Sequence, residues 1–362
     1  MSTIDIRKVT KKFGDFVAVR DVDLAVAAGE VVCLLGPSGC GKTTTLRMIA
    51  GLERATAGDV MVAGQRMNDL PPEKRNIAMV FQFYALYPAL TVRQNIAMPL
   101  HHERVGSAEI AARVHKVADV LHLREILDRL PGQISEGEKQ RIAVARAIIR
   151  DPNCFLFDEP LSRLDVELRH SMRGQIKAVL SNLSKATVIV THDQLEALTM
   201  ADRIAIMRDG VIEQVGSPHE VFAKPANLFV ASFIGTPQMN LIEVQFKGYS
   251  DGRAKVVFDQ QDVSLSVDPA VASLKPGKVT VGVRPRAFSV ASHDTRDTIE
   301  AMAELIEPMG AETLIHARTR TGGDIRVVVP RDKKVRTGEA LHLIPDRVQT
   351  HVFGDDGRAV RA

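Results

Sequence analysis

The residues best suited to chemistry form the run Gly36-Pro37-Ser38-Gly39-Cys40-Gly41-Lys42-Thr43. This run matches the phosphate-loop pattern G-x-x-x-x-G-K-[ST] at every fixed position. Glycines in such a loop let backbone N–H groups point inward at a phosphate, and the helix that starts at Thr44 adds partial positive charge. Lys42 can reach the β- and γ-phosphates, and the Thr43 hydroxyl can ligate Mg²⁺. We therefore predict a site for a nucleoside triphosphate with Mg²⁺.

The segments on either side of the loop supply the context that the motif requires. Residues 31–35 are a continuous apolar run typical of a buried parallel strand. Residues 44–51 have a helical pattern that ends on glycine. A glycine-rich turn that binds nothing is a poor alternative, because strand, turn and helix follow in the required order. Triphosphate binding alone does not separate a kinase, a GTPase, a motor and a transporter ATPase.

Two adjacent acids, Asp158 and Glu159, follow an apolar run at residues 154–157. A carboxylate at the tip of a buried strand beside a phosphate loop can hold Mg²⁺ through its water shell. A second carboxylate can orient and deprotonate an attacking water. Solvated acids at a strand end are the alternative, but the phosphate loop favours the catalytic interpretation. His192 follows a similar run at residues 188–191, where it could contact the γ-phosphate or have only a structural role.

Three further residues are candidates whose surroundings decide their role. Phe13 lies in the turn region between two predicted strands and either stacks on a purine ring or packs in the core. Gln82 ends an apolar strand, and the aromatic loop at residues 83–88 either forms a partner surface or packs under the next helices. Ser135 caps a predicted helix, whose free N–H groups make an anion site.

Composition excludes several classes of protein. The formal net charge of +3 in 362 residues is too small to indicate a nucleic-acid partner. No stretch approaches the ~20 apolar residues of a transmembrane helix, and the first residues lack the apolar core of a signal peptide. Three cysteines, Cys33, Cys40 and Cys154, are too few for a disulfide framework and suit a reducing cytoplasm. We expect a soluble chain that serves a membrane only as a peripheral subunit.

The order of apolar patterns predicts an α/β fold followed by an all-β region. Strand patterns and turns fill residues 4–34, residues 92–150 are helical, and helices then alternate with strands to about residue 216. After about residue 236, short strands separated by Gly, Pro and Asp turns predict a barrel or sandwich. We predict strands at residues 16–19, 22–26, 255–258, 263–267, 280–283, 314–317, 325–329 and 341–344, and helices at residues 111–127 and 218–223.

With these residues laid out, the chain resembles the ATP-binding subunit of an ABC transporter, and most closely the carbohydrate importers of the maltose type. The likeness covers nearly the whole chain. It consists of motifs in the family's order: the phosphate loop, the glutamine loop at Gln82, the Asp158-Glu159 tip, the segment Ser162-Arg163-Leu164-Asp165 and the His192 switch. Residues 231–240 and 281–285 resemble recurring segments of the family's C-terminal regulatory domain.

The resemblance implies a fold and a domain organisation. The fold is a P-loop NTPase core with an N-terminal antiparallel β subdomain and a helical subdomain, followed by an all-β, OB-like C-terminal domain. We place the nucleotide-binding domain at residues 1–235, its helical subdomain at about residues 88–152 and the C-terminal regulatory domain at residues 236–362.

The resemblance also implies roles for the candidate residues. The loop at residues 36–43 and Thr44 would hold the phosphates of ATP, and Phe13 would stack on adenine. The residues that would serve Mg²⁺ are Thr43, Gln82 and Asp158. The catalytic set would be Glu159 as the base for water, His192 as the sensor of the γ-phosphate and Lys42 on the phosphates.

In this family two such subunits sandwich two ATP molecules head to tail. Ser135 and Gly137 would close on the nucleotide of the other subunit, and Asp165 would couple the two sites. Gln82 and the aromatic loop would touch the membrane subunits and convert closure into motion. The implied partners are two transmembrane permease subunits and an extracytoplasmic solute-binding protein. The chain would act at the cytoplasmic face of the inner membrane, in uptake of a sugar, polyol or glycerol-phosphate-like solute.

The chain departs from the family at two places. The family signature is usually Leu-Ser-Gly-Gly-Gln, whereas residues 134–138 read Ile-Ser-Glu-Gly-Glu. Arg163 stands where the coupling segment usually has a small or neutral residue. Like charges at ~4 Å repel by about 4 kcal/mol at an effective dielectric constant of 20, unless Glu136 and Glu138 point away from the phosphate. We expect slow hydrolysis by a homodimer, whereas in a heterodimer the defect would fall on the partner's nucleotide.

Several alternatives stay open at this point. The same engine could serve a polyamine, iron or anion importer, since those also carry C-terminal β domains. A soluble kinase would not need the Ser135 helix or the Gln82 loop, and a DNA-repair ATPase would need a long coiled coil or zinc-binding cysteines. A regulatory ATP-binding protein of low activity remains compatible with the altered signature.

Overall fold

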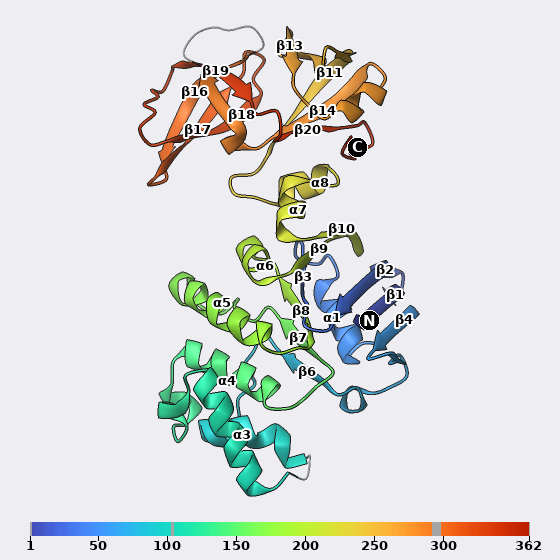
Figure 1. The fold of residues 1–362 in the computed structure, drawn as a ribbon, viewed down its shortest axis with the longest axis vertical. Helices are drawn as coiled ribbons and strands as arrows, with labels where there is room; N and C mark the ends of the chain where they lie inside the picture. Colours follow the sequence, from blue (N-terminus) through green and yellow to red (C-terminus); the bar gives the residue numbers. More distant parts are fainter. Residues whose placement is uncertain (1, 103–104, 292–297, 362) are drawn as a thin grey trace. The chain divides into compact units, whose positions relative to one another are not determined.

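The computed structural model describes residues 2–102, 105–291 and 298–361, and the chain divides into two compact units (Figure 1). The first unit ends at Pro218 and the second begins at His219. The sequence prediction placed the domain boundary after residue 235 instead. The predicted α/β core and the all-β C-terminal region are both confirmed.

The first unit is built on a six-stranded sheet with the strand order β10-β9-β3-β8-β7-β6. Its strands are β3 Val31–Leu35, β6 Ile77–Val80, β7 Cys154–Asp158, β8 Ala186–Thr191, β9 Arg203–Arg208 and β10 Val211–Gly216. The pairs from β9 to β6 are parallel, and β10 joins β9 in antiparallel register. Strands β3, β7 and β8 are buried along their whole length, which explains their nearly continuous apolar sequences.

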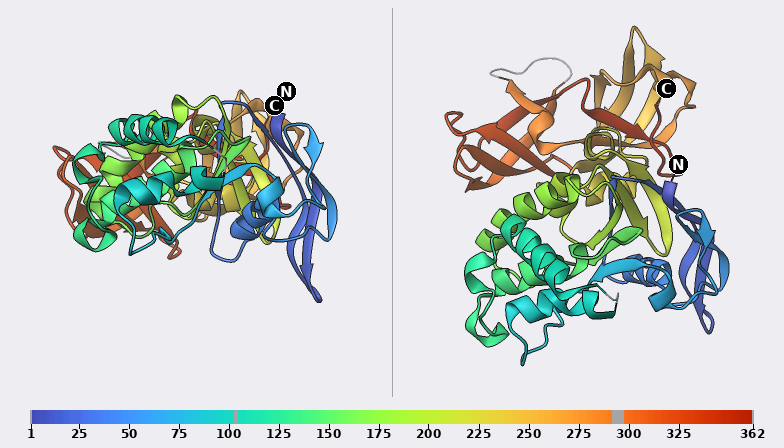
Figure 2. Two further views of the ribbon diagram at one scale, coloured as in Figure 1. Left: turned by 90° about the horizontal axis from the view of Figure 1, so that it is seen from below. Right: turned by 60° about the horizontal axis from the view of Figure 1, so that its bottom comes forward.

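Helices cover this sheet and begin at the edge where its parallel strands end. Helix α1 Lys42–Ala50 contacts β7 and β8, and α6 Gln194–Met200 contacts β3 and β8. Helix α5 Val166–Ser181 packs on α6. In Figure 2 the helices drawn in cyan and green gather on one side of this unit, and the blue antiparallel strands lie on the other. Loops that leave the carboxyl ends of parallel strands form the usual ligand site of such sheets.

A second, antiparallel sheet in this unit has the strand order β2-β1-β4-β5. Its strands are β1 Ser2–Phe13, β2 Phe16–Ala27, β4 Ala57–Val62 and β5 Gln65–Arg66. The predicted strands at residues 16–19 and 22–26 are one strand, β2. The break in the pattern comes from Asp21, which has a φ of 45° and whose backbone N–H donates to the Thr10 hydroxyl at 3.0 Å.

The helical region contains α2 Val92–Ala97, α3 Ser107–Val120 and α4 Glu136–Ile148, joined by short 3-10 turns. The helix predicted at residues 111–127 begins earlier and ends at Val120. It stops because His122 adopts the left-handed region at a φ of 52°, and a separate 3-10 turn forms at Arg124–Ile126. The predicted cap is confirmed, since Ser135 is the N-cap of α4.

The described residues of the second unit form two short α-helices and two five-stranded antiparallel sheets, ordered β13-β12-β11-β14-β20 and β15-β19-β16-β17-β18. The strands are β11 Asn240–Ser250, β12 Arg253–Phe258, β13 Gln261–Leu265, β14 Gly277–Val283, β15 Phe288–Ala291, β16 Ile299–Pro308, β17 Glu312–Arg318, β18 Asp324–Pro330, β19 Ala340–Pro345 and β20 Thr350–Phe353. One apolar core joins the two sheets. Each predicted strand corresponds to a member of this set, although the strand predicted at residues 263–267 ends at Leu265, and β11, β15, β16 and β20 were missed.

Helices α7 Pro218–Ala223 and α8 Leu228–Phe233 explain why the boundary lies earlier than predicted. The buried Arg284 donates hydrogen bonds to the carbonyl oxygens of Ile234 at 2.8 Å and Phe222 at 2.6 Å. Ala231 of α8 packs in a cluster with Met239 and Phe353. Both helices therefore contribute to the second unit.

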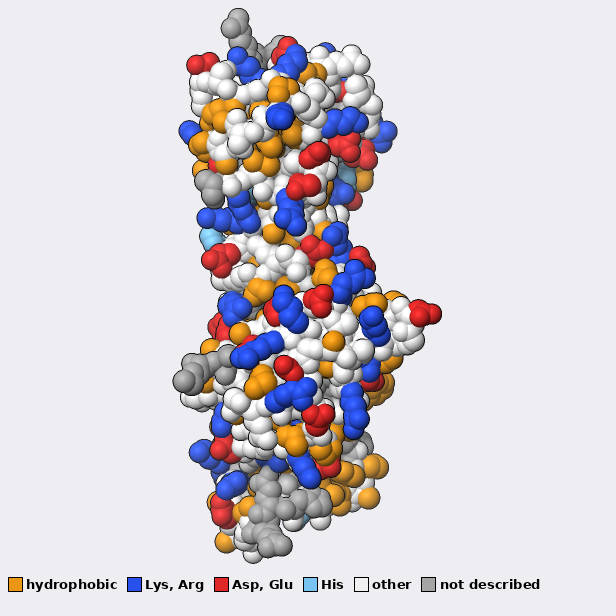
Figure 3. Space-filling view, turned by 90° about the vertical axis from the view of Figure 1, so that its right-hand side faces the viewer, with side chains coloured by type: hydrophobic (Ala, Val, Ile, Leu, Met, Phe, Trp, Pro, Cys, Tyr) orange, Lys and Arg blue, Asp and Glu red, His pale blue; other side chains and the backbone are white. Residues whose placement is uncertain are grey.

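The surface carries mixed charge. On the face seen in Figure 3, lysine and arginine side chains lie among aspartate and glutamate side chains. Among the described residues, no helix is long and apolar enough to cross a membrane.

We predict that Phe246→Ala destabilises the second unit without destabilising the first. Phe246 is 1% exposed in the core of the second unit, and removing a buried Phe side chain costs about 3–5 kcal/mol. Scanning calorimetry should show a downward shift in the melting of the second unit alone. The control Leu305→Ala, at a side chain that is 51% exposed, should shift no transition. Equal shifts of both units in Phe246→Ala would contradict the separation of the two cores.

Candidate nucleotide site

The phosphate loop lies between β3 and α1 and is shaped by close backbone contacts. A Cβ atom at Gly36 would lie 2.2 Å from the carbonyl oxygen of Met207. Gly41 has a φ of 102°, and a Cβ there would lie 2.6 Å from the carbonyl oxygen of Ala18. Only glycine fits at these two positions. The loop is thereby held against β2 and β9, with the N-terminus of α1 directly behind it.

The Lys42 side chain folds back over this loop. Lys42 is buried, and its ammonium group donates to the carbonyl oxygens of Gly36 and Pro37, both at 2.8 Å. Both acceptors are neutral carbonyl oxygens, so they do not compensate the positive charge of the ammonium group. That charge can therefore attract an anion that enters the loop. Cys40 is buried beside it, and burial raises the pKa of its thiol. Cys40 therefore behaves as a small packed residue of the loop and not as a thiolate.

Thr43 and Asp158 form the second part of the site. The Thr43 hydroxyl donates to the Asp158 carboxylate at 3.1 Å. Asp158 is 7% exposed, and burial raises its pKa. A buried carboxylate whose charge is not neutralised is a suitable ligand for a cation. The described residues include no cluster of three or more His, Cys, Asp or Glu side chains placed for a metal ion. The Thr43 hydroxyl and the Asp158 carboxylate are nevertheless oxygen donors of the kind that Mg²⁺ prefers, so the pair fits this ion.

Glu159 lies next to this pair and is contacted from two sides. One carboxylate oxygen lies 3.2 Å from Nδ1 of His192, and the other accepts from the Gln82 amide at 3.3 Å. Glu159 adopts a φ of 48°, and its backbone N–H donates to Val190 at 2.9 Å. The unusual backbone turns the side chain toward the two loops. Ser162 closes this turn, since its hydroxyl donates to the Glu159 carbonyl oxygen at 3.0 Å.

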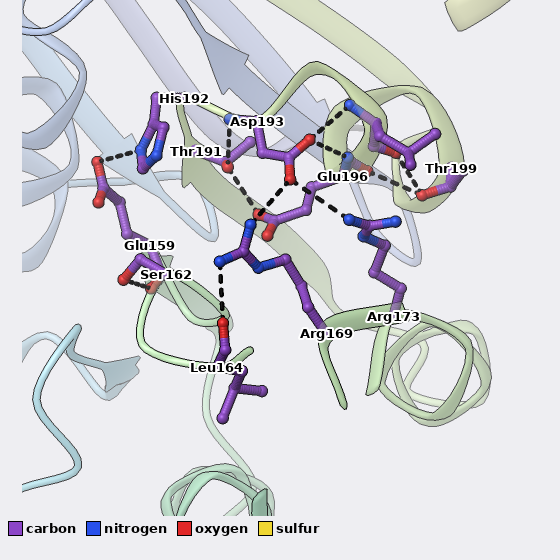
Figure 4. A network of polar contacts seen from close by, with 11 residues as sticks. Glu159, Ser162, Leu164, Arg169, Arg173, Thr191, His192, Asp193, Glu196 and Thr199 are labelled. Atoms are coloured by element: carbon purple, nitrogen blue, oxygen red, sulfur yellow. Dashed lines mark hydrogen bonds and ion pairs between the residues drawn. The ribbon is translucent and has the colours of Figure 1, made fainter. Parts of the chain in front are cut away.

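A polar network behind His192 fixes the segment that carries it (Figure 4). The buried Thr191 hydroxyl donates to Glu196 at 2.6 Å. Asp193 caps α6 by accepting from the backbone N–H groups of Leu195 and Glu196. Its carboxylate also lies 3.3 Å from Arg173 and 3.6 Å from Arg169. His192 is thus held between two anchored neighbours while its ring stays 56% exposed.

Sequence reasoning missed Arg169, Arg173 and Glu196. One local signal for Glu196 was present, since an Asp followed three residues later by Glu is typical of a helix N-terminus. The two arginines had no such signal, because α5 and β8 are brought together only by the fold. Arg169 also donates to the carbonyl oxygen of Leu164 at 2.9 Å, which ties the segment at residues 162–165 to the His192 segment.

The remaining predicted residues make their contacts elsewhere. Phe13 ends β1 with a side chain that is 47% exposed, and the Lys11 ammonium lies 4.6 Å from its ring centroid. The exposure excludes the core alternative, and stacking on a purine stays a prediction. Asp165 caps α5 by accepting from Leu168 at 2.8 Å. Gly137 faces Leu168, whose side chain would lie 2.9 Å from a Cβ there.

The polar groups of the signature segment, residues 134–138, are already hydrogen-bonded within the start of α4. The Ser135 hydroxyl and backbone N–H donate to Glu138 at 2.8 and 2.7 Å, and the Glu138 N–H donates back to Ser135. This is a capping box. Glu136 pairs with Lys139 at 2.7 Å, and this hydrogen bond lowers the pKa of the carboxyl. The hydroxyl donor of Ser135 is therefore used within the helix terminus.

Known proteins resemble the chain over nearly its whole length. A family model described as ABC transporter matches residues 19–162, and one described as TOBE domain matches residues 281–353. An sn-glycerol-3-phosphate import ATP-binding protein of Rhizobium johnstonii, UgpC 2, is 44% identical over 99% of this chain and 96% of the relative. The trehalose/maltose import ATP-binding protein MalK of Thermococcus litoralis is 43% identical over 98% of each chain.

A solved structure is similar to more than half of the chain. It is a dimeric post-hydrolysis state of the ATP-binding cassette MJ0796 bound to ADP and Pi. It is 30% identical, with a TM-score of 0.53, over 59% of this chain and 98% of its own. Because the likeness to the curated relatives spans the β-rich second unit as well as the phosphate loop, the chain belongs to the ATP-binding subunits of the ABC transporter family.

Proposed function

We propose that this chain is the ATP-hydrolysing subunit of an importer that takes up a sugar, a polyol or a glycerol-phosphate-like solute. The observation that carries the proposal is that His192 and Gln82 each contact one oxygen of the Glu159 carboxylate. A carboxylate that is fixed beside a phosphate loop is suited to take a proton from an attacking water. The import function is supported by relatives that are import ATP-binding proteins for trehalose/maltose and sn-glycerol-3-phosphate.

In this proposal the loop and its lysine bind ATP through the phosphates. Lys42 would exchange its carbonyl acceptors for phosphate oxygens, and backbone N–H groups of residues 36–44 would surround the β-phosphate. Thr43 and Asp158, with Gln82 alongside, would hold Mg²⁺, and that ion would neutralise part of the phosphate charge. Glu159 would accept the proton of water, and His192 would contact the γ-phosphate. Phe13 would stack on adenine. Catalysis of this type is mostly positioning and electrostatic stabilisation.

The Gln82 loop is suited to connect hydrolysis to membrane subunits. Phe83 is 61% exposed and Tyr87 is 44% exposed, so the loop does not pack under the following helices. The Arg163 guanidinium lies 3.9 Å from the Phe83 ring centroid, and Arg146 of α4 donates to the backbone of Tyr84. The loop is therefore tied both to the helix that Ser135 caps and to the segment after Glu159. This arrangement supports contact of the loop with permease subunits. In the proposed importer there are two such subunits, which the chain contacts at the cytoplasmic face of the membrane, and an extracytoplasmic binding protein delivers the solute.

The signature supports a dimer whose closure is weak at this chain's Ser135. The hydroxyl must leave Glu138 before it can donate to a phosphate, and Glu136 adds a second negative charge nearby. Two copies of this chain would carry the defect at both nucleotides. In a heterodimer it would affect only the nucleotide held by the other subunit, and the Glu159 site here would work normally if the partner's signature is intact.

We predict that Glu159→Gln abolishes hydrolysis and preserves ATP binding. Loss of a general base lowers the rate by about 10²–10⁴-fold, while the loop and Lys42 stay in place. Steady-state phosphate release and nucleotide-binding titrations would measure both. Glu125→Gln, at an exposed carboxylate outside the site, is the matched control. Undiminished turnover in Glu159→Gln would remove Glu159 from the catalytic role.

We predict that Asp158→Asn raises the melting temperature of the nucleotide-free chain and removes the stabilisation by Mg²⁺ and ATP. Because burial raises the pKa of Asp158, its ionised form is disfavoured in the folded state, and stability is lost as pH rises through the folded pKa. An amide avoids this loss and still accepts from Thr43. Thermal melts at pH 7 with and without Mg²⁺-ATP test both parts, with Asp15→Asn in an exposed turn as control. A lower melting temperature for nucleotide-free Asp158→Asn would contradict the prediction.

We predict that Glu136→Gly raises ATP turnover by the purified chain. Relief of about 1.4 kcal/mol of repulsion against the phosphate would increase the rate about tenfold. Glu109→Gly provides the control, because Glu109 also lies in the first turn of a helix and pairs with a basic side chain, Arg113. If Glu136→Gly leaves both turnover and transport unchanged, the altered signature is not a barrier to closure.

A further inference from the structure

The second unit contains a cavity of about 710 Å³ that the nucleotide chemistry does not use. It is lined by α7 and the residue after it, by the segment after β13, by Arg284 directly after β14, by β20 and the turn before it, and by residues 359–361. Its volume lies within the range of small-molecule sites, which is roughly 300–1,000 Å³. The cavity is therefore large enough for a metabolite.

The charge of the lining is strongly biased. Among the described residues that line the cavity, four are permanent cations, namely Lys224, Arg284, Arg347 and Arg361, and one, Asp268, is a carboxylate. The Asp268 carboxylate already accepts from the backbone N–H of Ala270 at 2.9 Å. Such a surplus of positive charge in one concave site attracts anions.

Arg284 is the fixed member of this set. It is 6% exposed, its guanidinium lies 3.6 Å from the Phe222 ring centroid, and its two hydrogen-bond acceptors are the neutral carbonyl oxygens of Ile234 and Phe222. Burial lowers the pKa of Arg284 to about 10, so it stays charged at neutral pH. A buried cation held by neutral acceptors lacks the compensation that buried charges normally have. A guanidinium held in one orientation matches phosphate or carboxylate oxygens.

The other side chains of the lining determine which uncharged groups of a ligand the cavity can contact. Burial, together with the charges of Arg284 and Arg361, lowers the pKa of His351 to about 4. This imidazole is neutral at pH 7 and can exchange a hydrogen bond with an uncharged ligand group. Apolar side chains cover part of the wall, including Val267, Val352 and the 85% exposed Val348 at the rim. The lining thus offers a cationic region beside a mixed apolar and neutral polar one.

We propose that this cavity binds a phosphate monoester of a small polyhydroxy metabolite. A phosphate monoester carries close to two negative charges at pH 7, which matches the three arginines Arg284, Arg347 and Arg361 better than a monocarboxylate does. Arg284, Arg347 and Arg361 hold the phosphate, and the apolar wall with His351 accommodates the carbon skeleton. The site goes beyond the proposed transport function, because a nucleotide is bound by the other unit.

Calorimetric titration of the full-length chain with glucose 6-phosphate and with sn-glycerol 3-phosphate tests the proposal. The test variant is Arg347→Gln/Arg361→Gln, because both side chains are exposed and Arg284 supports the fold. The matched control is Arg331→Gln/Arg336→Gln, which removes two exposed arginines of the same unit away from the cavity. Lys42→Ala removes binding of a phosphate ester at the phosphate loop.

We expect saturable binding of at least one ester, weakened at least tenfold in Arg347→Gln/Arg361→Gln and unchanged in the matched control and in Lys42→Ala. Glycerol, which lacks the phosphate, should not bind. Absence of saturable binding, equal binding by the test variant, or loss of binding in Lys42→Ala would overturn the proposal. Tighter binding of citrate than of either ester would overturn the assignment to phosphate monoesters.

Discussion

Parallel pairing of β3, β8, β7 and β6 is the constraint on which the nucleotide site depends. Leu35 pairs with Thr191, Val190 with Asp158, and Phe157 with Val80. Each strand therefore ends at the same edge, and the chemistry-bearing residues follow within one or two positions: Gly36, Gln82, Glu159 and His192. A parallel sheet must be covered on both faces. The site therefore depends on the apolar strands and also on the helices that cover them.

Much of this site could be predicted because each motif is local. The phosphate loop, the Asp158-Glu159 pair and His192 each follow an apolar run whose end determines where the polar residue lies. The supporting network could not be predicted in the same way. Arg173 meets Asp193, and Arg169 reaches both Asp193 and Leu164, only after α5 packs on α6. Such contacts depend on tertiary packing, and no spacing in the chain encodes them.

The fold predictions failed where backbone detail overrode the apolar pattern. A left-handed residue at His122 ended a helix whose periodicity continued, and Asp21 bent one strand so that it resembled two. The second compact unit begins earlier than the predicted C-terminal domain for another reason. Helices α7 and α8 follow the nucleotide core in the sequence, but the buried Arg284, which comes much later in the chain, donates to the carbonyl oxygens of Phe222 and Ile234. Long-range hydrogen bonds of this kind assign a segment to its domain.

The hydrogen bond between Gln82 and Glu159 has a consequence for the aromatic loop if Glu159 is the proposed base. A carboxylate that takes a proton from water loses its charge and becomes a weaker acceptor for the Gln82 amide. The hydrogen bond that holds the loop at Gln82 would therefore weaken in the same step that breaks the phosphate bond. Protonation of Glu159 would in this way couple the edge of the sheet to the loop that carries the exposed rings of Phe83 and Tyr87.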